Sequence, residues 1–183
     1  EAESAGLDLR GAFVGSEGTL GIATKVAVRL TKSAPSVRTL LLSFPSVDDA
    51  ANTVSAVIAN GVVPAAMEVM DQKITVAVEN YVGAGYPTDA AAVMLAEVEG
   101  LEGGTAIDAA TIAELGRANG ATEVRVAANE AERALLWKGR KTAFGAIAQL
   151  APDYYLHDTV VPRSKLAEVL NKVYEIADRH DVM

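Results

Sequence analysis

The chain has 183 residues, half of them apolar, which is enough material for one or two compact domains with buried cores. Its net charge of −8 and its lack of any Lys/Arg cluster exclude a broad nucleic-acid-binding face, and no apolar run approaches the ~20 residues that a membrane-spanning helix needs. The chain has no cysteine, which excludes disulfides, iron–sulfur ligation and thiol catalysis by its own residues and favours a reducing compartment such as the cytoplasm.

A glycine-rich turn comes first along the chain. Three glycines, one serine and one threonine fall within residues 15–22, directly before an expected strand at 22–31. Glycine permits unusual φ angles and close approach to the backbone, and free N–H and hydroxyl groups suit a diphosphate or the polar edge of a flavin. The spacing fits neither a P-loop, since no lysine follows the last glycine, nor G-x-G-x-x-G. A turn that only shapes the start of the strand is the alternative.

The backbone of this turn is the expected contact for a cofactor, because each N–H is a donor whatever the side chain. The carboxylate of Glu17 would repel a diphosphate, so we expect that side chain to turn away and cap nearby N–H groups. The candidate cofactor-binding residues are Gly15, Ser16, Glu17, Gly18, Thr19, Gly21 and Ile22.

The next segments alternate between strands and helices. Ser33-Ala34-Pro35-Ser36 is a candidate domain boundary and is followed by an expected strand at 37–44. Ser46 is a good N-cap for a helix that ends at Asn60-Gly61, and a strand at 65–70 and a helix at 71–82 follow.

The second half of the chain repeats this order. A strand at 92–98, a helix at 105–118 and a strand at 123–127 are expected, again with Asn-Gly after the helix. Two split β-α-β units predict a ferredoxin-like α+β fold, with a mostly antiparallel sheet and helices on one face. A parallel, doubly wound sheet also fits strand-helix alternation.

The C-terminal part is expected to hold a long helix, a strand and a last helix. The long helix should begin at Asn129 and run towards Leu150, and the strand should cover 154–161. The last helix, capped by Ser164, should bury an apolar stripe of Leu166, Val169, Leu170, Val173 and Ala177. Both ends of the sequence suggest a piece of a longer protein.

Several segments carry a resemblance to a known family. Residues 13–22 resemble the end of the FAD-binding domain in flavin-linked 2-hydroxy-acid oxidases and dehydrogenases of the vanillyl-alcohol oxidase superfamily. Four further segments are similar to the flavoprotein subunit of glycolate oxidase or to its D-lactate dehydrogenase relatives. They are Ala66-Met67-Glu68-Val69-Met70-Asp71, Gly85-Tyr86-Pro87-Thr88-Asp89-Ala90, Leu136-Trp137-Lys138-Gly139-Arg140-Lys141, and Pro152-Asp153-Tyr154-Tyr155 with 158–163.

The resemblance implies an organisation and a chemistry. Residues 1–31 would end the FAD-binding domain, and 32–183 would form a cap, or substrate, domain truncated at its C-terminus. The full-length protein would use FAD to oxidise a small 2-hydroxy acid, glycolate or D-lactate. The glycolate oxidase likeness also implies other subunits, including an iron–sulfur subunit, a membrane acceptor, and a cytoplasmic location at the inner face of the membrane.

The resemblance also implies substrate-binding residues. Arg140 occupies the position of the Arg in the Trp-x-x-Arg segment that contacts the substrate acid group in related enzymes, and a guanidinium can hold a carboxylate bidentately. Trp137 shares a helical face with Arg140 and would be a wall of the pocket. The alternatives are a surface Arg paired with a Glu, and a core Trp.

No catalytic base or metal site is expected in this chain. His157 beside Asp158 is more typical of a hydrogen-bonded or exposed histidine than of a general base, and His180 suits a helix C-terminus. The family's His-x-Gly-Asp-Gly-Asn-x-His segment is absent. We therefore expect the isolated chain to be inactive. The alternative class is a non-catalytic ferredoxin-like module for assembly or small-ligand binding.

Overall fold

The computed structural model describes residues 6–151, 153–156 and 158–182. Its internal contacts divide the chain into two compact units, Glu1–Ser33 and Ala34–Met183. The division falls inside the Ser33–Ser36 segment that the sequence indicates as a boundary.

The first unit contains one short helix, α1 (Leu9–Phe13). The Asp8 side chain caps it by accepting a hydrogen bond from the N–H of Gly11 at 2.8 Å. The strand predicted at 22–31 is wrong: these residues form no strand, and the apolar side chains of Val28 and Leu30 are exposed. A strand needs a hydrogen-bonding partner, and the described part of this unit offers none.

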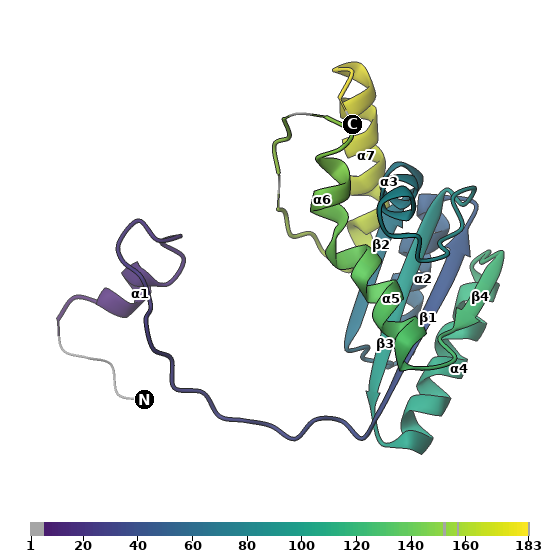
Figure 1. Cartoon of the computed structure of the whole chain (residues 1–183), viewed down its shortest axis with the longest axis horizontal. Helices are drawn as coiled ribbons and strands as arrows, with labels where there is room; N and C mark the ends of the chain where they lie inside the picture. Colours follow the sequence, from purple (N-terminus) through teal and green to yellow (C-terminus); the bar gives the residue numbers. More distant parts are fainter. Residues whose placement is uncertain (1–5, 152, 157, 183) are drawn as a thin grey trace. The chain divides into compact units, whose positions relative to one another are not determined.

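The second unit contains four strands and most of the helices (Figure 1). In chain order its elements are β1 (Ser36–Phe44), α2 (Val47–Ala59), β2 (Ala66–Asp71), α3 (Gln72–Val82), β3 (Ala92–Gly100), α4 (Glu102–Ala118), β4 (Glu123–Val126), α5 (Glu130–Lys141), α6 (Ala143–Ile147), the 3-10 turn η1 (Arg163–Lys165) and α7 (Leu166–Arg179).

The four strands form one antiparallel sheet in the order β2-β3-β1-β4. In the central pair, Ser36 of β1 lies opposite Gly100 of β3, and Phe44 lies opposite Ala92. Each half contributes one central strand and one edge strand, so the two β-α-β units interleave as the ferredoxin-like prediction requires. The α+β, antiparallel prediction is confirmed, and the parallel alternative is excluded.

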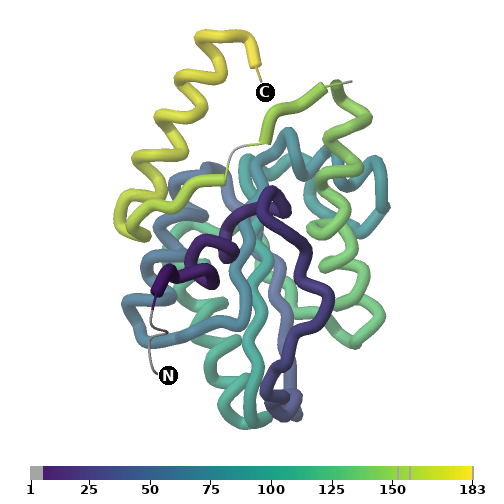
Figure 2. Tube along the Cα trace, turned by 90° about the vertical axis from the view of Figure 1, so that its left-hand side faces the viewer, coloured from purple at the N-terminus to yellow at the C-terminus, as the bar shows by residue number. Residues whose placement is uncertain are grey.

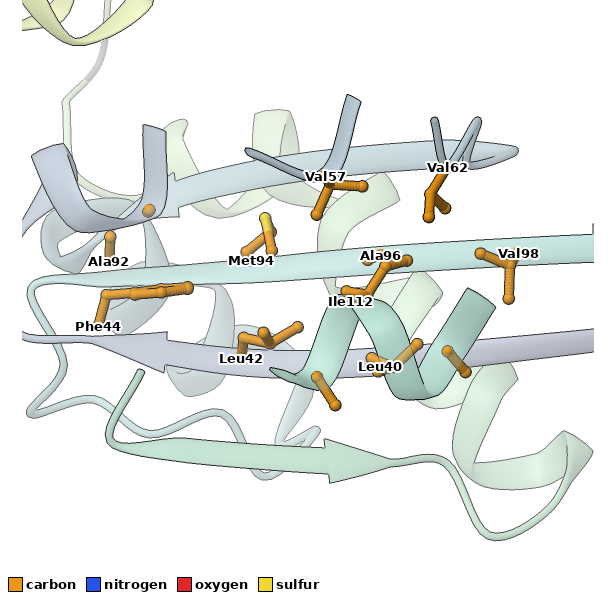
Figure 3. Packing of buried hydrophobic residues seen from close by; sticks show 13 residues of the cluster. Leu40, Leu42, Phe44, Val57, Val62, Ala92, Met94, Ala96, Val98 and Ile112 are labelled. Carbon is orange, nitrogen blue, oxygen red and sulfur yellow. The ribbon is translucent and has the colours of Figure 1, made fainter. Parts of the chain in front are cut away.

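One face of the sheet packs against α2 and α4. Figure 3 shows alternate residues of β1 and β3 on this face, among them Leu42 and Met94, directed toward Val57 of α2 and Ile112 of α4. All four of these side chains are fully buried. This layer is the one that the split β-α-β pattern predicts, since the two crossover helices lie on the same side.

The other face carries a second helical layer that the sequence pattern does not indicate. Leu41, Val93 and Leu95 form a separate core with residues of α3, α5 and α6, including Leu136. The central strands are therefore covered on both faces, which explains why they read as continuous apolar runs and not as alternating ones. Figure 1 shows α5 in front of the sheet on this side.

The helix predicted from Asn129 to Leu150 is two helices, not one. Thr142 separates α5 from α6 with φ −97° and ψ 10°, outside the helical range. Its hydroxyl donates to the carbonyl of Lys138 at 2.9 Å, which satisfies a carbonyl at the end of α5. After this break α6 packs on α3, where the Tyr81 ring lies close to Gly145.

Two further expectations for the C-terminal part are wrong. Residues 154–156 and 158–161 form no strand, and residue 157 lies outside the described residues. Ser164 does not cap α7, because it lies in the turn η1 and the helix begins after Lys165 without a side-chain cap.

The apolar stripe of α7 is only half-buried, and Val173 is 53% exposed. Helix α7 packs beside α2, as the yellow and blue segments of Figure 2 show, and the amide of Asn171 donates to Asp48 at 2.7 Å. The hydroxyl of Tyr174 also donates to Asp71 at the end of β2 at 3.1 Å, and these contacts cover only part of the stripe.

Candidate functional site

Helix α5 carries the predicted substrate-binding residues, and a capping box determines where it begins. The Asn129 side chain accepts from the N–H of Glu132 at 3.0 Å, and the Glu132 carboxylate accepts from the N–H of Ala128 at 2.8 Å. With this start, Arg133, Trp137 and Arg140 fall at i, i+4 and i+7 and share one face of the helix. That face is turned toward the sheet.

Glu97 of β3 binds two of these three side chains. Its carboxylate accepts from the indole Nε1 of Trp137 at 2.5 Å and from the Nε and Nη2 of Arg133 at 2.9 and 3.0 Å. The hydroxyl of Thr39 on β1 donates to the same carboxylate at 2.5 Å. The indole is thus fixed by its only donor, and the Glu97 charge is neutralised by a bidentate guanidinium.

These contacts determine the ionisation of the pair. Burial alone would raise the pKa of Glu97, but hydrogen bonds from Arg133, Thr39 and Trp137 outweigh it and lower that pKa below its ordinary value. The hydrogen bond to Glu97 in turn raises the pKa of Arg133. Both groups are therefore charged at neutral pH.

Arg140 pairs with Glu68 on β2. Its Nε donates to Glu68 Oε2 at 3.0 Å, and its Nη2 lies 2.9 Å from the same oxygen. The two side chains are about a third exposed, at 32% and 38%. This contact matches the alternative stated from the sequence, a surface Arg paired with a Glu. Among the residues that the structure describes, the Nη1 group of Arg140 contacts no acceptor.

Trp137 and Arg140 lie on one helical face, but only Trp137 lines the hollow beside it. A hollow of about 530 Å³ lies beside Trp137, and Arg140 is not part of its lining. Its walls are Ala66, Glu97, Arg133, Ala134, Trp137, Lys138, Lys141 and Thr142. Trp137 therefore lines a hollow that Arg140 does not line, and its role as a wall of the substrate pocket stays a prediction.

Tyr86 supports the turn of α5 that carries Arg140. Its hydroxyl donates to the carbonyl of Leu136, and its ring lies against Gly139, where any Cβ would overlap it. The backbone N–H groups of Ala84 and Tyr86 donate to the Glu79 carboxylate at 3.0 and 2.9 Å, which anchors the loop. Gly139 therefore serves close packing of helix on ring.

Sequence reasoning missed Glu68, Glu97 and Tyr86. Glu97 had a visible signal, since it interrupts the buried run Val93 to Val98 of a strand and a carboxylate there needs partners. Glu68 similarly lies inside the apolar strand β2. Their partners could not be read from the chain, because Glu97 and Arg133 are 36 residues apart and Glu68 and Arg140 are 72 apart.

The glycine-rich turn lies in the first unit and has an unusual backbone. Gly15, Gly18 and Gly21 have φ of +83°, +82° and +154°, and Glu17 has +48°. A Cβ at Gly15 or Gly18 would meet no atom within 4 Å, so the φ angles and not crowding account for glycine at these two positions in this structure.

The hydrogen bonds of this turn leave most of its donors available. Thr19 donates to the carbonyl of Ser16 through both its N–H at 2.9 Å and its hydroxyl at 2.6 Å. Within the described chain, the N–H groups of Gly15, Glu17 and Gly18 donate to no acceptor, and Glu17 caps no N–H group. The turn thus offers an exposed row of backbone donors suited to an anionic group.

The other expectations from the sequence concern His157, metal ions and membrane-spanning helices. His157 lies outside the described residues. In the ranges that the structure describes, no group of three or more His, Cys, Asp or Glu side chains is arranged to hold a metal ion. Nor does any helix in those ranges have the length and apolar character to cross a bilayer.

Comparison with known proteins identifies the family. The family model "FAD linked oxidases, C-terminal domain" matches residues 33–183. This chain belongs to the FAD-linked oxidases. The match covers the whole second unit, and FAD is the cofactor of this family.

The relatives of this FAD-linked oxidase chain include enzymes acting on two hydroxy acids. It is 42% identical over 180 residues to the glycolate oxidase subunit GlcD of Escherichia coli (strain K12), covering 98% of this chain and 36% of that protein. The Bacillus subtilis (strain 168) subunit GlcD is 38% identical, with 97% and 38% covered. The probable mitochondrial D-lactate dehydrogenase of Danio rerio is 32% identical, with 91% and 34% covered.

A solved structure supports the fold of the FAD-linked oxidase chain. An alkyldihydroxyacetonephosphate synthase superposes with a TM-score of 0.66 at 16% identity, covering 98% of this chain and 38% of that one. The likeness at this identity shows the fold alone. The chain spans about a third of the length of the relatives it matches.

Proposed function

We propose that this chain is the substrate-domain part of an FAD-dependent enzyme that oxidises a 2-hydroxy acid to the 2-oxo acid. Residues 1–31 would end the FAD-binding domain and 32–183 would form the substrate domain. The division of contacts after Ser33 and the family match from residue 33 support this boundary. When bound, FAD supplies the acceptor for the hydride that leaves Cα of the substrate.

The observation that carries the proposal is the position of Arg140 on α5. A guanidinium is charged at any physiological pH and can hold a carboxylate through two parallel hydrogen bonds. Among the described residues Nη1 of Arg140 has no acceptor, while its other edge is bound to Glu68. Its role is to bind the substrate carboxylate and so to orient Cα toward the flavin.

Two other groups would support this reaction. The exposed N–H groups of Gly15, Glu17 and Gly18 would bind the cofactor's diphosphate or the polar edge of its flavin. Trp137, fixed by Glu97, would form an apolar wall that excludes water. Among the candidate substrates, glycolate is favoured over D-lactate by the higher identity to the GlcD subunits.

We further propose that the full-length protein works with other subunits. The two GlcD relatives are named as subunits of glycolate oxidase, which supports an assembly of more than one chain. An iron–sulfur subunit as electron acceptor, and a cytoplasmic location at the inner face of the membrane, are the finer parts of this proposal.

The test uses the full-length protein that contains this chain, purified with its flavin. Glycolate, D-lactate and L-lactate are added separately without oxygen while the flavin absorbance is followed. We expect glycolate or D-lactate to bleach the flavin. The variant Arg140→Met should need about ten to one hundred times more substrate for the same rate, because one charged hydrogen-bonding group is lost.

Arg179→Met is the matched control, since Arg179 is exposed in the last turn of α7. It should behave as the unmodified protein does. A yellow protein that none of the three acids bleaches would keep the family and remove the hydroxy-acid assignment. A full-length protein without flavin would favour the non-catalytic binding module.

A further inference from the structure

We propose that Glu68 is a positioning residue, which holds the guanidinium of Arg140 in the orientation that binds the substrate carboxylate. This inference rests on the proposed function and assigns a role to a second residue of the same site. Glu68 lies on β2 and Arg140 on α5, so their contact joins the sheet to the helix above it.

The geometry of the pair leaves the useful edge of Arg140 open. A guanidinium is planar and has two edges that can each bind a carboxylate: the side edge, with Nε and Nη2, and the end edge, with Nη1 and Nη2. Glu68 occupies the side edge through Oε2, at 3.0 Å from Nε and 2.9 Å from Nη2. Within the described ranges, the end edge has no protein acceptor at Nη1.

An orienting partner matters because Arg140 is not held by burial. Its side chain is 32% exposed, and a free arginine side chain has many rotamers to lose on binding. Glu68 extends from a strand whose register with β3 is defined over its whole length. Contact with this strand restricts the guanidinium plane before substrate arrives, and so lowers the entropy lost on binding.

Glu68 also carries a negative charge, which opposes the binding of an anionic substrate. Orientation of Arg140 by Glu68 would lower KM, whereas repulsion of the substrate by Glu68 would raise it. If orientation dominates, removal of the Glu68 carboxylate raises KM; if repulsion dominates, removal lowers it. Because the Glu68 charge is offset by its contact with two guanidinium nitrogens, we expect orientation to dominate.

The experiment measures steady-state kinetics of the full-length holoenzyme with glycolate and D-lactate. Glu68→Ala should raise KM about tenfold, the loss expected for a hydrogen bond to a charged group, while kcat and flavin content change little. Glu68→Gln should raise KM less than Glu68→Ala does, since the amide oxygen can still accept one hydrogen bond. In an Arg140→Met background, Glu68→Ala should have no further effect on KM.

Glu130→Ala is the matched control, because Glu130 also pairs with an arginine, at 2.8 Å from Arg133, but on the exposed side of α5. It should leave KM unchanged. If Arg140→Met itself leaves KM unchanged, the proposed carboxylate site is wrong. If Arg140→Met raises KM and Glu68→Ala leaves or lowers it, the role of Glu68 is overturned. If Glu68→Ala does not fold, Glu68→Gln replaces it. A raised KM then supports the role of Glu68, and an unchanged or lowered KM overturns it.

Discussion

Tyr86 shows at the level of one residue how the second helical layer is held. Its hydroxyl reaches the backbone of α5 at Leu136, and its ring fills the space that Gly139 leaves open. The side chain is only 4% exposed. Burial is the main cause that raises the pKa of Tyr86 to about 12, since the phenolate would lose its hydration.

This pKa predicts a stability change at high pH. In the unfolded chain Tyr86 has its ordinary pKa of 10.0, so between pH 10 and 12 the unfolded state loses the proton first. The stabilisation is complete below pH 10 and decreases as pH rises to 12, by up to about 2–3 kcal/mol. Urea unfolding between pH 10 and 12 should show a smaller loss of stability for Tyr86→Phe than for the unmodified chain. Equal losses in both proteins would contradict the assignment.

At the level of elements, α5 is attached to the sheet by charged groups as well as by apolar contacts. Glu97 receives donors from Thr39 on β1 and from Arg133 and Trp137 on α5, and Glu68 receives Arg140. Only Leu136 and Gly139 of this helix are buried. The position of α5 therefore depends strongly on two carboxylates of the sheet.

This dependence predicts the effect of Glu97→Ala. Removal of the carboxylate leaves a half-buried guanidinium and an indole N–H without their partner, and we expect about 1–3 kcal/mol of lost stability. Glu99→Ala is the control, because Glu99 shares the face of Glu97 on the same strand but is exposed. Urea titration at pH 7 measures both. A Glu97→Ala loss no larger than that of Glu99→Ala would show that apolar contacts alone hold α5.

At the level of the whole molecule, the chain contains only part of what the proposed reaction needs. Catalysis requires the acceptor, a base and the carboxylate-binding group to be held together. In the proposed reaction the glycine-rich turn and Arg140 would each supply one contact, and we expect the base to come from outside this chain. The chain spans about a third of its relatives.

We therefore expect the purified 183-residue chain to oxidise neither glycolate nor D-lactate and to bind FAD weakly. An assay with an added dye as electron acceptor, together with flavin fluorescence titration, tests both points. Steady turnover of either acid by this chain would contradict the expectation. The full-length protein, assayed in parallel, shows that the acceptor and substrates are competent.

The success of the sequence-based prediction differs along the chain. From residue 36 to 126 each expected strand and helix forms, with ends shifted by a few residues, because period and caps are local properties. After 129 the prediction is poorer. The break at Thr142, and the absence of strands at 22–31, 154–156 and 158–161, depend on packing partners that local patterns do not contain.

The sequence by itself determined the order of the central elements and, by resemblance, the family, whereas the choice of an antiparallel over a parallel sheet needed the structure. The element order and the family follow from apolar periodicity, helix caps and motifs, which depend only on residues close together in the sequence. Only the tertiary structure decided that both faces of the sheet are covered and that Arg140 is paired with Glu68 and Trp137 with Glu97. Such pairs join residues 40 to 72 positions apart, and their contact arises from the fold and not from any local pattern.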